Sequence, residues 1–327
     1  MKIIVDAFGG DNAPNEVIKG AKAAIDDFNV SIGLSGSTEK IKKACAELGI
    51  DSTLFEIIEA PDVFDIHEEP TKLLKEGKNT SMAVGLAVAA ETEDCAFVSA
   101  GSTGALIAGA TFITKRIKGI KRVALAPVLP SAKGRFLLLD AGANTENRPE
   151  QLLQFAVMGS AYMQAAESVA APKIGLLNIG SEDTKGRDLE REAYKLLTES
   201  DLDFYGNLEA REMPFGACDV VVTDGFTGNI ALKLYEGMGS YFAKTLKGIL
   251  GTGAGKLAGL MVLPKINDFK KKMDYRETGG GLVLGASKAV IKAHGSSDAR
   301  AFYNAIRQGK LCIENKMTEK IAAGLDR

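Results

Sequence analysis

Polar side chains follow short apolar segments at five points of the chain, in turns that contain glycine. The segments end at Asp6, Ser99, Asp140, Asn178 and Asp224. Each turn leads into residues with helical apolar spacing, so each is predicted to connect a strand to a helix. Ligands of open α/β sheets bind beyond the carboxyl ends of the strands. If the five strands are parallel, all five turns lie on one edge, and we expect a polar ligand there.

Phosphate is the ligand that such turns favour. Backbone N–H groups and the helix dipole at a helix N-terminus attract an anion. The best candidates are residues 100–105, Ala-Gly-Ser-Thr-Gly-Ala, and residues 225–229, Gly-Phe-Thr-Gly-Asn. Any single glycine turn is explained better by tight packing than by phosphate binding. The recurrence of the turns is what favours a binding site.

Inorganic phosphate can itself act as a nucleophile, because it needs a cation and hydrogen-bond donors rather than a strong base. Lys185, Asn178, Asn144 and Asn229 are residues of the right types in the right loops. The alternatives are a solvent-exposed lysine and asparagine or aspartate side chains that only cap helices.

The sequence gives little support to other known catalytic motifs. The sequence has no G-x-x-x-x-G-K-[ST] loop and no G-x-S-x-G elbow. Its two histidines are His67 and His294, and no His, Cys and carboxylate cluster has metal-ligand spacing. His294 is predicted to follow a helix, as a cap or as a proton donor. We expect neither a metal nor a cofactor.

Strands alternate with helices along the whole chain. Residues 53–59 and 95–99 are among the expected strands, and helices are expected at about 149–166 and from residue 230 onward. The pattern predicts a three-layer α/β/α fold with a mostly parallel sheet, and residues 1–327 form a single domain. Apolar residues make up 46% of the sequence and the net charge is −2, which excludes a disordered chain and gives no overall attraction to nucleic acid. Scattered cysteines and the lack of a signal peptide or a long apolar span predict a cytoplasmic protein.

Residues 246–275 are predicted to protrude as an apolar and basic helical segment, part of a longer helical region near 230–275. An amphipathic basic helix beside an apolar tip can lie on an anionic membrane or contact an acidic partner. The alternative is a helix pair at a dimer interface. A second basic run follows the helix expected at 106–114. The candidate contact residues of the two regions are Leu257, Leu260, Val262, Lys265 and Lys271, and Lys115, Arg116 and Lys118.

Taken together, the turns resemble the phosphate acyltransferase family of bacterial phospholipid synthesis (PlsX type). Eight motifs carry the resemblance in family order over nearly the whole chain: Asp6-Ala-Phe-Gly-Gly-Asp11, Ser99-Ala-Gly-Ser-Thr-Gly-Ala105, Asp140-Ala-Gly-Ala-Asn144, Asn178-Ile-Gly-Ser-Glu-Asp-Thr-Lys-Gly186, Gly206-Asn-Leu-Glu-Ala-Arg211, Asp224-Gly-Phe-Thr-Gly-Asn229, Asp274-Tyr-Arg-Glu-Thr-Gly-Gly280 and His294-Gly-Ser-Ser297.

The resemblance implies an enzyme of phospholipid biosynthesis that converts fatty acyl-[acyl carrier protein] and inorganic phosphate into acyl phosphate and free carrier protein. It further implies a fold like that of phosphotransacetylases and isocitrate dehydrogenase, a homodimer, and peripheral contact with the inner membrane face and the downstream glycerol-3-phosphate acyltransferase. Nucleic acid is not an expected partner.

Residue roles follow from the same resemblance. Lys185 and Asn229 are predicted to contact phosphate and the oxyanion, and His294 to donate a proton. The remaining substrate-binding candidates lie in the turns: Asp6, Gly9, Gly10, Ser102, Thr103, Gly104, Asp140, Asn144, Asn178, Arg211, Asp224, Gly225 and Gly228. The chain departs from the family pattern at Ser102, where asparagine is usual, and at residues 281–284, Gly-Leu-Val-Leu, which replace an Ala-Pro-Leu-Leu-like run.

Two alternatives belong to other classes. A nicotinamide-dependent dehydrogenase would need an adenosine-ribose carboxylate and usually a metal triad, and neither is found in the sequence. A non-catalytic scaffold that binds carrier protein at the membrane would lack phosphate-dependent thiol release. The acyltransferase hypothesis predicts that Lys185→Ala abolishes this release in a folded protein.

Overall fold

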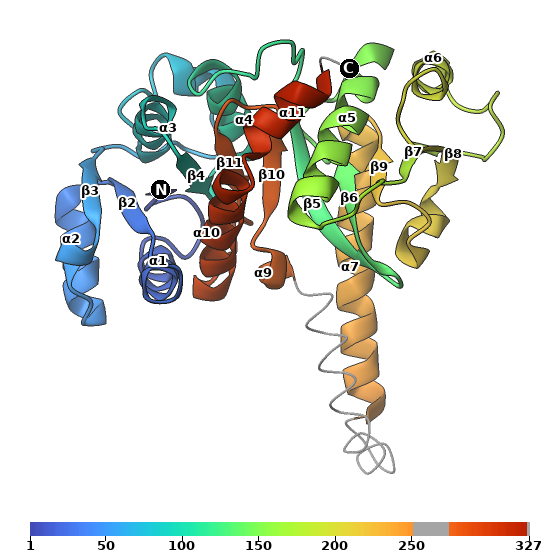
Figure 1. The fold of residues 1–327 in the computed structure, drawn as a ribbon. Coiled ribbons are helices and arrows are strands. Elements are labelled where there is room, and N and C mark those ends of the chain that lie inside the picture. Colours follow the sequence, from blue (N-terminus) through green and yellow to red (C-terminus); the bar gives the residue numbers. More distant parts are fainter. Residues whose placement is uncertain (251–274, 326–327) are drawn as a thin grey trace.

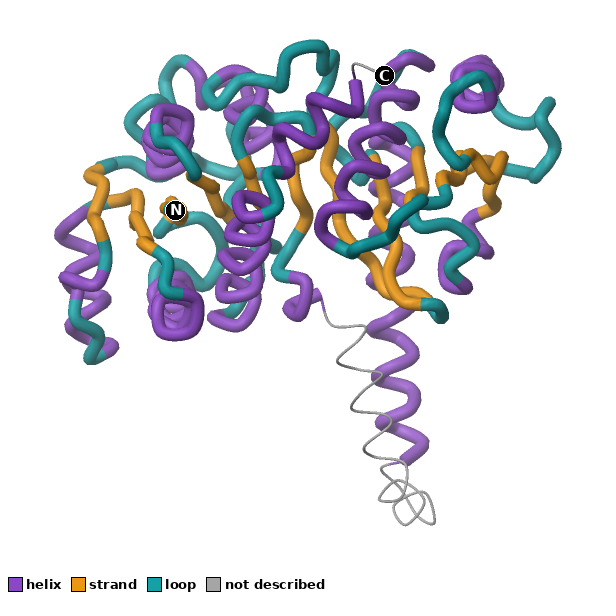
Figure 2. The backbone as a smooth tube through the Cα atoms, in the orientation of Figure 1, coloured by secondary structure: helices purple, strands orange, loops and turns teal. Residues whose placement is uncertain are grey.

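The computed structural model describes residues 1–250 and 275–325. Within these residues, eleven strands form one sheet in the order β3-β2-β1-β4-β11-β10-β5-β6-β9-β7-β8 (Figures 1 and 2). The strands are β1 (Lys2–Asp6), β2 (Ser31–Gly36), β3 (Glu56–Glu59), β4 (Cys95–Ser99), β5 (Ala124–Ser131), β6 (Gly134–Leu139), β7 (Ile174–Asn178), β8 (Phe204–Glu209), β9 (Val220–Val222), β10 (Gly281–Leu284) and β11 (Ala289–Lys292).

Helices cover both faces of the sheet. The α-helices are α1 (Asn15–Phe28), α2 (Thr38–Leu48), α3 (Ser81–Glu91), α4 (Thr103–Phe112), α5 (Pro149–Ala166), α6 (Asp188–Thr198), α7 (Gly225–Leu250), α9 (Tyr275–Thr278), α10 (Ala299–Glu314) and α11 (Met317–Leu325). The short 3-10 helices are η1 (Ser52–Leu54), η2 (Pro70–Leu74) and η3 (Ala210–Phe215).

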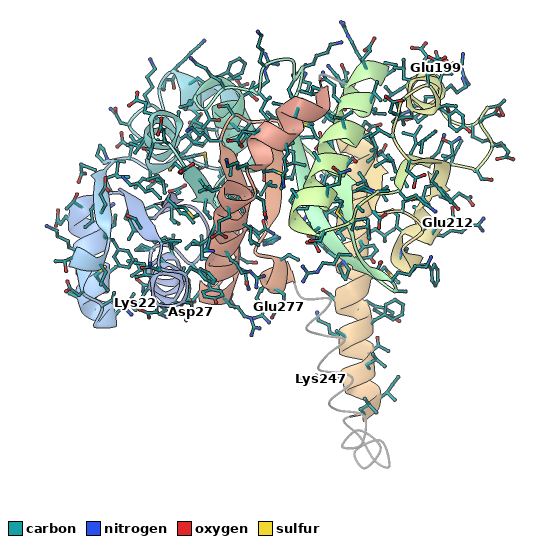
Figure 3. The ribbon with its side chains drawn as sticks, viewed as in Figure 1. Lys22, Asp27, Glu199, Glu212, Lys247 and Glu277 are labelled. Carbon is teal, nitrogen blue, oxygen red and sulfur yellow. The ribbon has the colours of Figure 1, made fainter. Side chains whose placement is uncertain are left out.

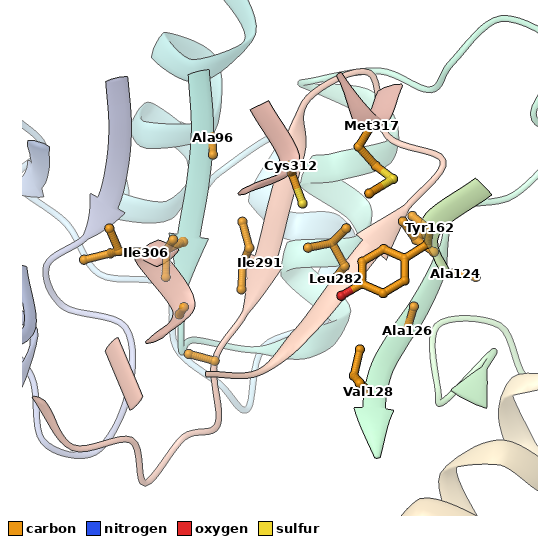
Figure 4. Packing of buried hydrophobic residues seen from close by; sticks show 14 of the residues in the cluster. Ala96, Ala124, Ala126, Val128, Tyr162, Leu282, Ile291, Ile306, Cys312 and Met317 are labelled. Atoms are coloured by element: carbon orange, nitrogen blue, oxygen red, sulfur yellow. The ribbon is translucent and has the colours of Figure 1, made fainter. Parts of the chain in front are cut away.

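Two buried apolar clusters separate the layers. On one face, α1, α2, α5, α6, α10 and α11 pack with side chains such as Phe155 and Phe302; Figure 4 shows Tyr162, Cys312 and Met317 against Leu282 and Ile291 of the central strands. On the other face, η2, α3, α4 and α7 pack through a second cluster. The predicted three-layer α/β/α fold is confirmed.

The strands form two parallel groups that run in opposite directions. β3, β2, β1, β4 and β11 are mutually parallel, and so are β6, β9, β7 and β8. Between the groups, the pairs β11–β10, β10–β5 and β5–β6 are all antiparallel. Three reversals turn the second group around, so the prediction that all five turns lie on one edge is wrong. Asp6 and Ser99 lie on one edge, whereas Asp140, Asn178 and Asp224 lie on the other.

Three element boundaries also differ from expectation. The strand expected at 53–59 begins at Glu56, because Asp51 caps η1 by accepting from Thr53 N at 2.9 Å. The helix expected from residue 230 begins at Gly225, so only Asp224 of its polar turn precedes it. The segment before His294 is the strand β11 rather than a helix, since it pairs with β4 and β10.

Helix α7 extends well beyond the sheet, and Lys247 marks its distal part in Figure 3. The described part of the segment expected near 230–275 therefore protrudes. Residues 251–274 lie outside the described residues, and with them Leu257, Leu260, Val262, Lys265 and Lys271. None of the described helices has the length and apolar character needed to span a bilayer.

Candidate active site

A groove of about 1090 Å³ runs between α7 and the strands β5, β10 and β11. Its lining follows β5 from Leu125 to Pro130, so the groove extends along most of that strand. The walls carry apolar side chains along their length and polar groups near both ends. The lining includes Thr103, Leu125, Leu129, Gly142, Asn229, Leu232, Lys233, Tyr235, Glu236, Lys292, His294 and Ser296.

Turns from both edges of the sheet meet in this groove. Gly142 and Asn229 come from the turns after β6 and β9, and Thr103 and His294 come from those after β4 and β11. Gly142 has a φ of 131°, and a Cβ there would lie 3.4 Å from the Asn229 side chain. The groove therefore brings together turns that the sheet topology separates.

Asp6 holds the turns of β1 and β4 together. Its carboxylate is buried and accepts hydrogen bonds from Ser99 Oγ at 2.7 Å and from Phe8 N at 3.2 Å. Burial raises the pKa of this carboxyl above its ordinary value, and the hydrogen bonds act against the rise. Gly9 is required beside it, since a Cβ would lie 2.7 Å from Asp6 Oδ2. Gly10 packs on Ala100 and the Gly295 carbonyl. Asp6 therefore holds the turns after β1 and β4 in position, but its side chain does not line the groove.

Asp140 organises the turn after β6 through five hydrogen bonds. Its Oδ1 accepts from Leu125 N, Gly142 N and Ala143 N at 2.9 to 3.0 Å. Its Oδ2 accepts from Asn144 N and Asn144 Nδ2, both at 2.8 Å. Burial raises the pKa of the Asp140 carboxyl, and the N–H donors oppose this shift. The carboxylate has no remaining role as a ligand, since its oxygens are occupied by the chain.

Asp224 caps α7 by accepting from Thr227 N at 2.7 Å, and it forms an ion pair with Arg187 at the start of α6. Hydrogen bonds to Glu190 and Asp224 raise the pKa of Arg187 above its ordinary value. Gly225 N donates to Asn144 O at 2.8 Å, and a Cβ on Gly228 would meet the Asp140 carbonyl. These residues lock the turns after β6 and β9 to each other.

Cationic groups gather at the other end of the groove. Lys292, at the end of β11, and Lys233, on α7, both line it. Burial lowers the pKa of Lys292 to about 8, and the charge of Lys233 acts in the same direction. Thr103 lies in the first turn of α4, whose cap Ser102 accepts from Ala105 N at 3.4 Å. Two lysines and a helix N-terminus make this end suited to an anion.

His294 lies beside Lys292 in the same wall. Its Nδ1 is 2.9 Å from Ser296 Oγ and accepts from Ser296 N at 3.3 Å. A backbone donor to Nδ1 favours the tautomer with its proton on Nε2. Burial, followed by the charge of Lys233, lowers the pKa of His294, so a neutral ring is favoured near pH 7.

Of the predicted catalytic and substrate-binding residues, Thr103, Asn229 and His294 line the groove and the others do not. Asn178 Nδ2 donates to Lys185 O and Asn207 Oδ1, which holds the turn between β7 and α6. Lys185 is 45% exposed, with Nζ 3.8 Å from Glu182. Arg211 is exposed and pairs with Glu209. Gly104 packs on Pro70, and Lys115, Arg116 and Lys118 are exposed in the segment after α4.

Two charged residues near the predicted turns, Lys292 and Arg187, are not among the residues predicted from the sequence. Lys292 ends the apolar segment Ala-Val-Ile-Lys, and a lysine directly after buried β-branched residues is the signal that could have identified it. Arg187 sits at the start of a helix, where arginine is not expected, because the dipole there favours acidic side chains. Its partner Asp224 explains the exception.

A family model described as fatty acid synthesis protein matches residues 1–320 of the chain. The chain belongs to this family. The predicted resemblance to phosphate acyltransferases is confirmed by curated relatives of that name. One from Clostridium botulinum is 46% identical over 327 residues, covering 99% of this chain and 98% of its own. One from Bacillus licheniformis is 47% identical over 320 residues, covering 97% and 96%. The family member described here is an acyltransferase enzyme.

Solved structures confirm the fold. EutD phosphotransacetylase from Staphylococcus aureus superposes with a TM-score of 0.61 at 16% identity, covering 99% of this chain and 94% of its own. A phosphotransacetylase from Streptococcus pyogenes gives 0.61 at 18% identity, covering 100% and 94%. The expected likeness to the phosphotransacetylase fold is therefore correct.

Proposed function

We propose that the enzyme transfers a fatty acyl group from acyl carrier protein to inorganic phosphate, for phospholipid synthesis. The observation that carries the proposal is the groove, which joins a cationic end, at Lys292 and Lys233, to apolar walls such as Leu129, Leu232 and Tyr235. The cationic end suits phosphate and the walls suit an acyl chain with its thioester.

The reaction needs no external oxidant, reductant or strong base. An oxygen of HPO₄²⁻ attacks the thioester carbonyl carbon, a C–O bond forms, and the C–S bond breaks. The electron pair of that bond leaves with sulfur, and the phosphate proton ends on the thiol. A pantetheine thiol has a pKa of roughly 8.5, so its thiolate departs with little acid help. The products are acyl phosphate and free carrier protein.

Within this reaction, Asn229 is proposed to donate to the carbonyl oxygen as it becomes an oxyanion. Asn229 and Lys233 are one turn apart on α7, and both line the groove. His294, with its proton favoured on Nε2, is proposed to stabilise the departing sulfur. Asp6, Asp140 and Asp224 act by fixing the turns.

The deciding experiment is phosphate-dependent thiol release from a fatty acyl carrier protein by the purified enzyme. Release that saturates with phosphate, together with a product that reacts with hydroxylamine as acyl phosphates do, is the expected result. A protein that binds acyl carrier protein without releasing thiol would be a scaffold. Protection against heat by NAD would instead favour the dehydrogenase hypothesis.

Lys185 is tested by Lys185→Ala. Its role as a phosphate contact requires the loop of residues 179–186 to reach the groove, since the side chain points to Glu182 in this structure. The prediction is loss of phosphate-dependent release with an unchanged melting temperature. Near-normal turnover would refute the role and leave the groove lysines as the phosphate contacts.

The enzyme is further proposed to be a homodimer that contacts the membrane peripherally, with Lys115, Arg116 and Lys118 as contacts for the acidic carrier protein. For the dimer, α7 offers an exposed apolar stripe at helical spacing, which a second copy of the chain would cover. Its members are Phe226, Ile230, Leu234, Met238 and Tyr241, each more than 40% exposed.

The stripe predicts the outcome of a charge substitution. Leu234→Glu would place a carboxylate in the apolar contact, so the dimer is expected to dissociate at least tenfold more readily. Sedimentation equilibrium measures this. Lys247→Glu also places a carboxylate on an exposed position of the same helix, outside the stripe, and is the control. Equal dissociation constants for both variants would rule out this interface.

A further inference from the structure

Among the described residues, Lys292 has no counterion in direct contact. Its Nζ donates to two backbone carbonyls, Ala100 O at 3.3 Å and Ala293 O. No carboxylate of the described chain lies within ion-pair distance of it; Asp6 and Asp11 favour its charge only from farther away. Two neutral acceptors leave one N–H of an ammonium for a ligand in the groove.

Charged groups of both signs surround Lys292. Lys233 faces it from α7, and its charge disfavours the ammonium of Lys292. The N-terminus of α4 contributes Thr103 to the same groove. An anion bound here would neutralise the charge of Lys292, for which the described chain offers no ion pair, and it would accept from donors that are already positioned.

We propose that Lys292 binds the attacking inorganic phosphate at this end of the groove. The inference rests on the proposed function and adds a phosphate contact on β11, apart from the loop of Lys185 in this structure. The other groove lysine is less available, because Lys233 Nζ is 2.8 Å from Glu236. Lys185 lies outside the groove beside Glu182.

The position also fits the required attack. Lys292 and His294 are separated by one residue and line the same wall, and Asn229 lines the groove as well. Phosphate held by Lys292 would therefore share one cavity with the groups proposed for the carbonyl oxygen and the leaving sulfur. The carbonyls of Ala100 and Ala293 fix the direction of the side chain before phosphate arrives.

Lys292→Met tests the proposal, because methionine keeps the length of the side chain and removes its charge. Lys288→Met is the matched control: Lys288 precedes β11, lies outside the groove and donates to Thr92 O at 2.6 Å. The Lys292 variant is expected to raise the phosphate KM about tenfold or more. Its KM for the acyl thioester stays within about twofold, and the control changes neither.

A second measurement does not require turnover. Inorganic phosphate is expected to raise the melting temperature of the native enzyme and of Lys288→Met, but not of Lys292→Met. An unchanged phosphate KM, or equal protection of Lys292→Met by phosphate, would overturn the proposal. If the native enzyme releases no thiol, the proposed function fails, while the protection experiment still decides whether Lys292 binds phosphate.

Lys292→Arg covers the case in which the methionine variant does not fold. Arginine keeps the charge at every accessible pH, so phosphate protection is expected to persist above pH 8, where native Lys292 loses its proton. The charged groups that act on the site, Lys233, Asp6, Asp11 and His294, are the same in both proteins. Loss of protection in the native protein and in Lys292→Arg at the same pH would overturn the proposal.

Discussion

Gly228→Ala is expected to destabilise the enzyme by at least about 3 kcal/mol and to abolish turnover. A Cβ at this position would lie 1.8 Å from the Asp140 carbonyl oxygen and 2.9 Å from both Asp140 C and Thr223 Cγ2. The first contact is with backbone, which cannot move aside as a flexible side chain does. Either α7 or the turn after β6 must shift, and both line the groove.

Gly248→Ala provides the comparison for this substitution. Gly248 lies in the same helix, and an added Cβ would meet nothing within 4 Å. The change is therefore expected to stabilise the protein by up to about 1 kcal/mol through helix propensity. Denaturant unfolding of both variants measures the difference. Similar midpoints would show that the turns adjust to the extra methyl group.

Asp140→Ala is expected to cost at least about 4 kcal/mol of unfolding free energy, because five N–H donors lose their acceptor together. These donors belong to Leu125, Gly142, Ala143 and Asn144. The loss of these hydrogen bonds also affects the site, because Gly142 lies next to Asn229 in the groove lining. Catalysis is expected to fall even under conditions where the variant remains folded.

The control for charge removal is Asp51→Ala. Asp51 is an exposed cap whose carboxylate accepts from Thr53 N, and its loss should lower the unfolding free energy far less than the loss of Asp140. Thermal unfolding and thiol release are measured for both variants. If Asp140→Ala were no less stable than Asp51→Ala, the hydrogen-bond network of Asp140 would not organise the turn.

The local structure could largely be predicted from the sequence. The strand at 95–99 and the helix at 149–166 have the predicted bounds, because apolar patterning and helix start signals act over short distances. The strand directions could not be predicted. Residues 132 and 133 join β5 to β6 as a tight hairpin, but apolar segments of this length leave parallel and antiparallel pairing open.

The sequence indicates which polar residues lie in the turns, but not what each of their side chains binds. The turn residues Asp6, Asp140 and Asp224 are predicted to bind substrate, yet their carboxylates accept hydrogen bonds from the chain itself. A sequence pattern does not reveal which of several polar residues is satisfied internally, since that depends on partners far away in the chain, as with Arg187 and Asp224. The groove could not be predicted because it forms between distant elements.

The central position of β10 and β11 has a consequence for how the chain folds. Both strands come from residues 281–292, yet they lie between β4 and β5 in the middle of the sheet. Until these residues leave the ribosome, the earlier strands form two separate half-sheets with unpaired edges at β4 and β5. Such open edges invite pairing with other chains. Folding is therefore expected to finish late, in a single step that joins both halves and creates the groove at the same time.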